Sequence, residues 1–449
     1  MKALVIAAVS AALLAGCAQS VPGKAGESSR LDPSKVAGLA ITTGDSGPRP
    51  GAPAADRQVR NSDGGAIDKL AASAVADVEG YWESQFPDRF GKDFEPVRTL
   101  VSYDSRGENQ RLCGTDTKGL VNAFFCSTDD LIAWDRGELL PSFEPISSVA
   151  VLAHEMGHAV QFRLGVGGNT PTIVKEQQAD CYAGNYFRWV AEGNSKRFQV
   201  STGPGLNQIL TTLFAIRDSA GSAFDAEGAH GTAFDRVTAF TFGFSEDPQR
   251  CAAIDLAEIS KRSTQDVFGA QDGDIGFGAG NLKVDDQQAL QDLKNSLIAA
   301  FPDSKVRWDG KCADTTPASY CEGGVVGIDL KALVKVGKLG DFAAFGAVAS
   351  RYAIAVQDSM GLSIEGVVAG QRTACLTGQW ANTIIRSRKA PLQLSPGDLD
   401  EAIAELLSRG SLIAGDAKGV TIPSGFARVE AFRDGFLNGT GQSCTTRYR

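Results

Sequence analysis

Two of the three histidines in this 449-residue chain lie four residues apart, on either side of a glutamate. The motif is His154-Glu155-Met156-Gly157-His158. Residues four apart share one face of a helix, so both imidazoles can bind one zinc ion. Glu155 then lies beside the ion, where a base for an activated water molecule is needed. The motif therefore predicts a zinc site with hydrolytic chemistry and Glu155 as the general base.

A second acidic pair lies downstream, in the segment Lys175–Gly184, which we expect to be a helix. Glu176 and Asp180 are four residues apart and share a face. Catalytic zinc takes three protein ligands and keeps one open position, so Glu176 is the predicted third ligand beside the two histidines. We expect Asp180 to accept the ring N–H of a ligating histidine and so fix its tautomer. The alternative is structural: two hydrogen-bonded histidines, and an acidic pair on a solvated helix face.

The residues in front of the motif favour a helix that carries it. One apolar stripe of this helix consists of Val149, Leu152, Met156 and Val160. Ser147 or Ser148 is the expected N-cap. Histidines bury poorly on such an apolar helix without a partner, and a zinc ion supplies one.

Eight of the nine cysteines fall into two sets of four with similar spacing. The sets are Cys113, Cys126, Cys181, Cys251 and Cys312, Cys321, Cys375, Cys444. Their gaps are 13, 55 and 70 residues in the first set and 9, 54 and 69 in the second. This agreement predicts a duplicated domain. The simplest disulfide hypothesis pairs first with second and third with fourth in each copy: Cys113–Cys126, Cys181–Cys251, Cys312–Cys321 and Cys375–Cys444.

Other landmarks align the two copies, and the alignment removes the predicted site from the second. Ala159-Val160-Gln161 matches Ala355-Val356-Gln357. On this basis His154, Glu155, His158, Glu176 and Asp180 correspond to Ser350, Arg351, Ile354, Gly370 and Ala374. Residues 265–449 contain no histidine. We therefore expect residues 265–449 to be a catalytically inert repeat with a structural or binding role.

The first 16 residues are typical of a secretion signal. A charged start is followed by an apolar run through Leu14 that is too short to span a membrane. Leu14-Ala15-Gly16-Cys17 resembles the lipobox of bacterial lipoproteins, which implies cleavage before Cys17 and lipid attachment to it. The chain would then be extracytoplasmic and anchored to the cell membrane. An ordinary signal peptide with an incidental cysteine is the alternative.

Composition limits what the rest of the chain can be. Residues 17–62 are rich in Gly, Pro, Ser and Ala without apolar periodicity, so we expect a flexible tether. The remaining length exceeds one ordinary domain and suggests two. A net charge of −9 without a basic run argues against nucleic acid as a partner.

The order of these motifs resembles the bacterial neutral zinc metallopeptidase family, which has a gluzincin-like ligand arrangement. The resemblance covers roughly residues 70–255 and rests on His154–Gln161, Glu176–Gly184, His230-Gly231 with Arg236, Gly243-Phe244 with Cys251, and Phe124–Cys126 with Asp135. It implies an α+β, zincin-like domain over residues 63–260, mainly helical with a small sheet. The segment Phe124–Trp134 would supply an edge strand that binds an extended peptide substrate.

The resemblance leaves several points open. The chain departs from the family pattern at Ala159, Asp218 and Asp235. His230 is interpreted either as a donor to the oxyanion of the reaction or as a hydrogen-bonded structural histidine. Arg236 recurs as Arg428 in the second copy, which favours a structural role for it.

Two functions from different classes follow from these features. The first is a membrane-anchored, extracytoplasmic, zinc-dependent endopeptidase that acts on a peptide or protein substrate. The alternative is a non-catalytic, zinc-stabilised lipoprotein of the cell envelope that binds a partner. Hydrolysis of cell-wall amide bonds is a further possibility, because the same site chemistry permits it.

Overall fold

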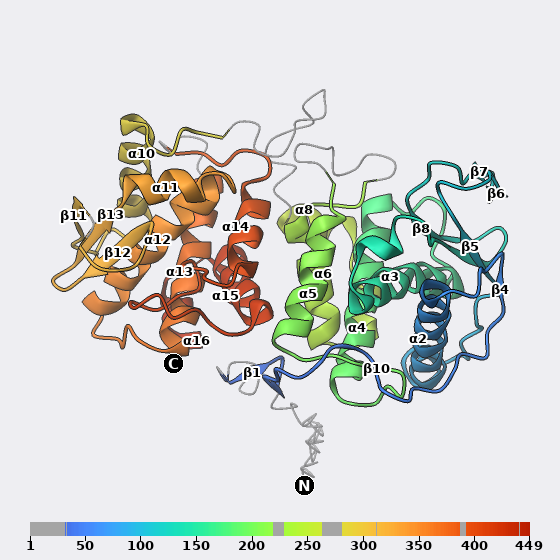
Figure 1. The fold of residues 1–449 in the computed structure, drawn as a ribbon. Helices are drawn as coiled ribbons and strands as arrows, with labels where there is room; N and C mark the ends of the chain where they lie inside the picture. The colour runs from blue at the N-terminus through green and yellow to red at the C-terminus, as the bar shows by residue number, and fades with distance from the viewer. Residues whose placement is uncertain are drawn as a thin grey trace, which may run out of the picture.

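A computed structural model describes residues 32, 34–218, 229–262, 281–310, 312–386, 392–439 and 441–449. The chain forms two units that lie side by side (Figure 1). The first contains residues 34–262, and the second, coloured yellow to red, contains residues 281–449. Each unit is mainly helical and carries a small sheet, as expected for an α+β protein.

The first unit is built around a four-stranded sheet with the order β4-β5-β9-β8. The strands of this unit are β1 (Lys35–Val36), β2 (Leu39–Ala40), β3 (Gly47–Pro48), β4 (Val59–Arg60), β5 (Thr99–Tyr103), β6 (Arg111–Leu112), β7 (Thr115–Asp116), β8 (Ala123–Cys126), β9 (Leu131–Asp135) and β10 (Phe198–Gln199). The parallel strands β5 and β9 are almost wholly buried, as is usual for parallel strands covered on both faces. β8 pairs antiparallel with β9 and forms one edge of the sheet.

Two long buried helices of the first unit carry the predicted site. The helices of this unit are α2 (Ala66–Phe90), η1 (Leu140–Ser142), α3 (Pro145–Leu164), α4 (Thr172–Ala191), α5 (Pro204–Ala215), α6 (Ala233–Ser245), α7 (Pro248–Ala252) and α8 (Leu256–Arg262). α3 contains the zinc motif and α4 contains the acidic pair. Both pack against each other in the core.

The expected N-cap of α3 is wrong. The helix begins at Pro145, with Glu144 as the N-cap residue and no capping side chain. Proline is favoured in the first helical turn because its missing N–H would have no partner there. Ser148 is therefore inside the helix, where its hydroxyl donates to the Leu140 carbonyl. The helix ends at Leu164, and the next residue, Gly165, adopts a left-handed conformation with φ of 77°.

Residues 34–62 lie against the first unit, so the expectation of a flexible tether is wrong for this stretch. β3 pairs with β10, and β4 extends the sheet beside β5. Thr42 and Thr202 exchange backbone N–H and hydroxyl hydrogen bonds of 2.8 and 2.9 Å. Backbone and small polar groups make these contacts, and composition does not reveal them. The first unit therefore starts upstream of residue 63. Residues 17–31, including Cys17, lie outside the described residues.

The second unit has a three-stranded sheet with the order β11-β13-β12. Its strands are β11 (Arg307–Gly310), β12 (Ala318–Cys321) and β13 (Val325–Ile328). Its helices are α10 (Gln287–Ala300), α11 (Leu330–Val336), α12 (Asp341–Ser359), α13 (Val367–Arg386), α14 (Asp398–Leu407), α15 (Gly425–Asn438) and α16 (Gly441–Arg447). β11 pairs parallel with β13, and β12 pairs antiparallel with β13. The strands β5, β9 and β8 of the first unit are paired in the same way.

The helices of the two units also follow the same packing pattern. In the first unit α4 packs on α6, and a Cβ at Gly243 would overlap the carbonyl oxygen of Cys181. In the second unit α13 packs on α15, and a Cβ at Gly435 would overlap the carbonyl oxygen of Cys375. Only glycine permits this approach of two helix backbones. The two close crossings thus use glycines at corresponding places in each unit.

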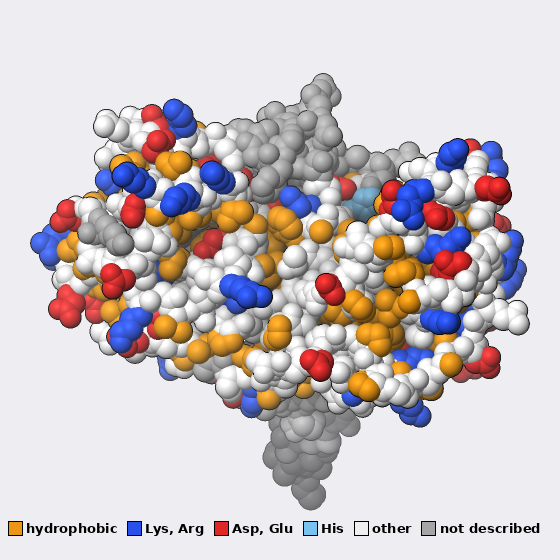
Figure 2. Space-filling view, viewed as in Figure 1, with side chains coloured by type: hydrophobic (Ala, Val, Ile, Leu, Met, Phe, Trp, Pro, Cys, Tyr) orange, Lys and Arg blue, Asp and Glu red, His pale blue; other side chains and the backbone are white. Residues whose placement is uncertain are grey.

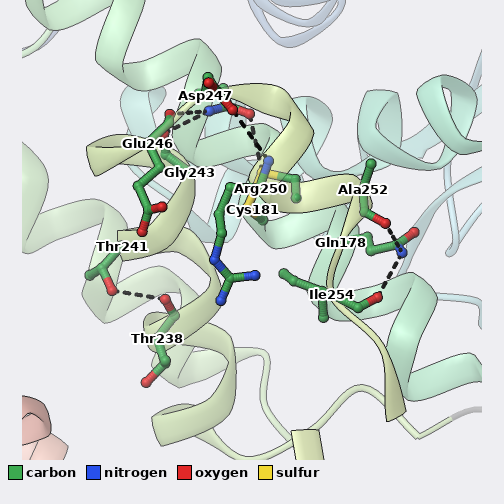
Figure 3. The surroundings of a disulfide bond; sticks show 12 residues. Gln178, Cys181, Thr238, Thr241, Gly243, Glu246, Asp247, Arg250, Ala252 and Ile254 are labelled. Atoms are coloured by element: carbon green, nitrogen blue, oxygen red, sulfur yellow. Dashed lines mark hydrogen bonds between the residues drawn. A yellow bond between two sulfur atoms is a disulfide. The ribbon is translucent and has the colours of Figure 1, made fainter. Parts of the chain in front are cut away.

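Four disulfides join the cysteine pairs expected from their spacing. They are Cys113–Cys126, Cys181–Cys251, Cys312–Cys321 and Cys375–Cys444. The second ties α4 to α7, and the fourth ties α13 to α16. Beside the second bridge, the Gln178 side chain donates to the backbone oxygens of Ala252 and Ile254 (Figure 3). These contacts fix α7 against the helix that carries the acidic pair.

The two units meet through the same pair of helices from each, α5 and α6 against α14 and α15 (Figure 1). The ring of Phe234 packs 5.3 Å from that of Phe436, and the ring of Phe244 packs 5.1 Å from that of Phe426. The two aromatic pairs are exchanged when the units are exchanged, as at a two-fold interface. The buried apolar residues of both units form one continuous cluster. Each unit therefore depends on the other to cover its core.

Among the described residues, no helix combines the length and the apolar content needed to cross a membrane.

We predict that Gly243→Ala lowers the free energy of unfolding by about 1–3 kcal/mol, because the new methyl group forces α4 and α6 apart. Gly435→Ala should have a similar effect in the second unit, since α13 and α15 meet in the same way. Gly80→Ala is the matched control, because that glycine is in the middle of α2 with open space at its Cβ position. The control should stabilise by about 1 kcal/mol. Calorimetric unfolding of the three variants tests this, and equal behaviour of all three would contradict it.

Candidate metal and active site

Close approach of α3 and α4 brings the predicted ligands together. A Cβ at Gly157 would lie 2.7 Å from the Cα atom of Ala179, so glycine at this position lets the two backbones approach. His154 and His158 lie on the same face of α3, one turn apart. Glu176 lies one turn before Ala179 on α4. The helix crossing therefore places all three side chains at one point.

The three predicted ligands converge, with each offering one donor atom within 4.8 Å of the others. The Nε2 atom of His154 is 3.2 Å from Oε2 of Glu176, and Nε2 of His158 is 3.4 Å from Oε1. The centroids of the two imidazole rings are 4.9 Å apart, with their planes at 88°. Two nitrogen donors and one carboxylate thus face a common centre.

Each histidine also holds its second ring nitrogen against a protein oxygen. Nδ1 of His154 is 2.7 Å from Oδ1 of Asp180, as expected from the sequence. Nδ1 of His158 is 3.0 Å from Oε1 of Gln161, a contact that we did not predict. Gln161 is itself held, because its amide group donates to the Lys175 carbonyl. Such partners fix the tautomer and the ring orientation of a metal-binding histidine.

Arg236 contacts the same oxygen of Asp180 as His154 does. Its Nη2 atom donates to Oδ1 of Asp180 at 2.9 Å, and its Nη1 atom donates to the Ile216 carbonyl at 3.0 Å. Both charged side chains are almost fully buried. A buried carboxylate without a partner is costly, so the contact with Arg236 helps to hold Asp180 in place. This agrees with the structural role expected for Arg236.

The charges of the site are strongly coupled when no metal is bound. Burial opposes the charged form of His154, but Asp180 and Glu176 outweigh it and raise the pKa of His154 to about 10. Burial likewise opposes the charged form of His158, yet Glu176 raises its pKa. Burial would raise the pKa of Glu176, but the two histidines hold it well below its usual value. Protons therefore compete with any metal for these donors.

The donor set fits a zinc ion better than it fits ion pairs alone. Oε2 of Glu176 is buried and forms no hydrogen bond within the described part of the chain, although His154 lies 3.2 Å away. Two imidazoles and one glutamate match the ligand set of catalytic zinc sites that keep an open position. His154, His158 and Glu176 are the residues that would hold the ion.

Glu155 lies beside the donors without joining them. Its Oε2 atom accepts the backbone N–H of Phe125 at 2.9 Å. Phe125 belongs to β8, so Glu155 connects α3 to the edge strand. Burial raises the pKa of Glu155 above its usual value. Burial thus favours the protonated form of this carboxyl group.

The metal donors and the edge strand β8 line one cavity of about 630 Å³. Its lining includes Val121 to Phe125, Val151, the histidines and glutamates of the site, Phe162, Ile216, His230 and Arg236. Val121 and Phe162 are both 46% exposed at its rim. The rim of the cavity therefore includes two exposed apolar side chains.

His230 lines the same cavity, and half of its side chain is exposed. Histidine atoms are visible at the surface of the first unit in Figure 2. Nδ1 of His230 lies 3.1 Å from Oδ1 of Asp218, and this contact is the main reason why the pKa of His230 is raised. Asp218 was noted only as a departure from the family pattern, and its role in holding His230 was not predicted.

In the described part of the second unit, no such group of donors lies at the corresponding place. Arg351, which aligns with Glu155, is fully buried. Its guanidinium donates to the carbonyls of Leu412, Gly415 and Asp416. Five N–H donors on a planar group suit a cluster of carbonyl oxygens. A loop bound to arginine therefore fills this part of the second unit.

The fold and the converging side chains define a protein with a candidate zinc site. The chain belongs to the family described as "Putative neutral zinc metallopeptidase", whose model matches residues 23–254. This match begins upstream of residue 34, in agreement with the packing of residues 34–62 on the first unit. It ends before the described part of the second unit begins.

Two relatives of the chain are described as "Uncharacterized protein YpfJ", one from Escherichia coli strain K12 and one from Escherichia coli O6:H1 strain CFT073. Each is 29% identical over 212 residues, which cover 41% of this chain and 70% of the relative. No solved structure matches the chain.

Replacing one ligand or its partner should change metal binding in a graded way. We predict that Glu176→Ala abolishes stoichiometric zinc, because two imidazoles alone leave the ion under-coordinated. Asp180→Asn should keep zinc but weaken its affinity by about ten- to a hundredfold. Elemental analysis and chelator competition measure the two effects. Glu192→Ala, which changes the exposed glutamate at the C-terminal end of α4, is the control. Full zinc content in Glu176→Ala would point to another ligand.

Proposed function

We propose that the chain is a zinc-dependent endopeptidase of the cell envelope that uses Glu155 as its general base. One observation carries this proposal. The Glu155 carboxyl group is aimed at the cavity between the three metal donors and the edge strand, but it is not one of the donors. A base in this position can serve a water molecule that attacks a peptide lying along β8.

His154, His158 and Glu176 would hold the zinc ion. The chemistry that bound zinc supplies is Lewis-acid polarisation of a carbonyl group and acidification of water. Glu155 accepts the proton of the attacking water and then delivers it to the departing amine. Burial raises the pKa of Glu155, so this carboxylate takes up the proton more readily than an exposed glutamate would.

The outer edge of β8 would bind the substrate backbone. The backbone N–H of Phe125 donates to Glu155 rather than to β9, so it faces the cavity side of the strand. An extended peptide can pair with such an edge through main-chain hydrogen bonds. The exposed apolar residues at the rim, Val121 and Phe162, would contact side chains of the substrate. Backbone pairing of this kind favours an unfolded or extended segment as substrate.

His230 would donate a hydrogen bond to the oxyanion that forms when water attacks the carbonyl group. It lines the cavity and is half exposed, so a substrate can reach it. Asp218 contacts the Nδ1 atom, so Nε2 would be the nitrogen that donates to the oxyanion. The charge that Asp218 favours on His230 strengthens such a donor.

The second unit would be a degenerate copy of the first. The same strand pairing, the same glycine crossings and the matching disulfides support duplication. The copy lacks all three residues that would bind the metal, and Arg351 occupies the place of the general base. The second unit keeps the fold without the site. This observation supports the second candidate function, a non-catalytic zinc-stabilised lipoprotein that binds a partner.

We also propose that lipid on Cys17 anchors the protein to the outer side of the cell membrane. The lipobox-like Leu14-Ala15-Gly16-Cys17 sequence supports this location. Four disulfides support it as well, because such bonds persist outside the cytosol.

We predict that Glu155→Gln binds zinc stoichiometrically but loses activity by about a hundredfold to ten-thousandfold, because glutamine cannot accept the proton. Glu108→Gln, at an exposed position, is the matched control and should keep full activity. Cleavage of casein or an envelope protein extract is the assay. Equal turnover in Glu155→Gln and the wild type would contradict the role of Glu155.

The same assay separates the alternatives. Stoichiometric zinc without cleavage of any protein would favour the non-catalytic lipoprotein. Release of fragments from purified peptidoglycan, without proteolysis, would favour a cell-wall amide hydrolase.

For the anchor, we predict that Cys17→Ser moves the protein out of the membrane fraction, because no other residue in the signal region can carry the thioether lipid. Metabolic labelling with a radioactive fatty acid provides a second measurement. Label on the Cys17→Ser variant would contradict this assignment.

A further inference from the structure

Two stretches of the first unit, residues 216–218 and 230–236, hold His230 and Arg236 at the cavity. The Asp218 carboxylate accepts the backbone N–H groups of His230 and Gly231 at 2.6 and 2.8 Å. The backbone N–H of Asp218 donates in turn to the Gly231 carbonyl at 3.1 Å. The Ile216 carbonyl accepts from Arg236, which supports Asp180 and through it His154. The position of these two stretches therefore sets where His230 and Arg236 lie at the cavity.

One carboxylate of the second unit holds both stretches at once. Asp400, on α14, is 1% exposed. Its Oδ1 atom accepts the backbone N–H of Phe234 at 3.1 Å, and its Oδ2 atom lies 3.2 Å from Nε of Arg217. Phe234 is in the first turn of α6, where backbone N–H groups have no partner inside the helix and favour a negative charge. Asp400 therefore caps α6 from outside and pairs with the residue next to Asp218.

The reciprocal contact of the interface lacks this charge. Asn207, on α5, accepts the backbone N–H of Gly425 at the start of α15, at 2.7 Å. Each unit thus caps a helix of the other. The cap given to the unit with the metal donors is a carboxylate paired with an arginine, whereas the cap given to the unit without them is a neutral amide.

We propose that Asp400 is a positioning residue for His230, so that the second unit completes the active site of the first. Without Asp400, Arg217 and the start of α6 lose their shared partner, and the two stretches are free to shift relative to each other. A shift of about 1 Å in a group that stabilises developing charge is enough to lower turnover by about a hundredfold. The kinetic part of this inference rests on the proposed peptidase function.

The kinetic test compares Asp400→Ala with Asn207→Ala in the full-length, zinc-loaded protein. The second variant removes the reciprocal cap and leaves residues 216–218 and 230–236 untouched. Asp400→Ala should lower kcat by about tenfold or more while KM and zinc content change by less than about twofold. Asn207→Ala should keep kcat within about twofold of the wild type. Asp400→Asn, which keeps an acceptor for the Phe234 N–H but loses the charge, should lie between the wild type and Asp400→Ala.

A double-mutant cycle tests whether Asp400 acts through His230. In a His230→Ala background, Asp400→Ala should cause no further loss of kcat, because its target is already absent. Losses that multiply in the double variant, or equal losses in Asp400→Ala and Asn207→Ala, would overturn the proposal. In that case the interface would act only on general stability.

A structural readout keeps the proposal testable without peptidase activity. The chain has only three histidines, so the imidazole NMR signals of His230 can be assigned by comparison with His230→Ala. These signals should shift or broaden in Asp400→Ala and keep their wild-type positions in Asn207→Ala. Unchanged signals in Asp400→Ala would overturn the proposal. Shifted signals in a protein that cleaves no peptide would support the positioning role while rejecting the peptidase function.

Discussion

The site depends first on how closely α3 and α4 can approach each other. Glycine at position 157 removes the Cβ that would otherwise meet the Ala179 backbone. A larger residue there would move the histidine nitrogens away from the Glu176 carboxylate. A displacement of about 1 Å is already half of a metal–ligand distance of about 2 Å. Backbone packing, rather than any side-chain contact, is therefore the constraint on which the donor geometry rests.

Once the donors are buried together, their charges must be stabilised from outside the centre. Burying an unpaired charge costs several kcal/mol, so each charged group requires a partner. Asp180 supports His154, Arg236 supports Asp180, and the Ile216 carbonyl holds Arg236. Asp400 then binds the neighbouring backbone from the second unit. The chain of partners extends from the cavity to the interface, so a contact from the second unit is part of what holds the site of the first.

The parts of the site that obey helical periodicity could be predicted from sequence, and the parts that depend on distant packing could not. Four-residue spacing identified the two histidines, and it also identified Glu176 and Asp180. Matching cysteine gaps identified the disulfide pairs. By contrast, Asp400 is separated from Phe234 by 166 residues, and nothing in the local sequence of α14 distinguishes it from other acidic residues of that helix. The N-terminal stretch misled us because backbone and hydroxyl contacts, which have no compositional signature, hold residues 34–62 against the first unit.

Anomalous X-ray diffraction at the zinc edge, on crystals of the zinc-loaded protein, tests the central claim most directly. The account predicts one strong anomalous peak at about 2.0–2.2 Å from Nε2 of His154, Nε2 of His158 and a carboxylate oxygen of Glu176. A peak bound elsewhere, or a fully loaded protein with no zinc between α3 and α4, would contradict it.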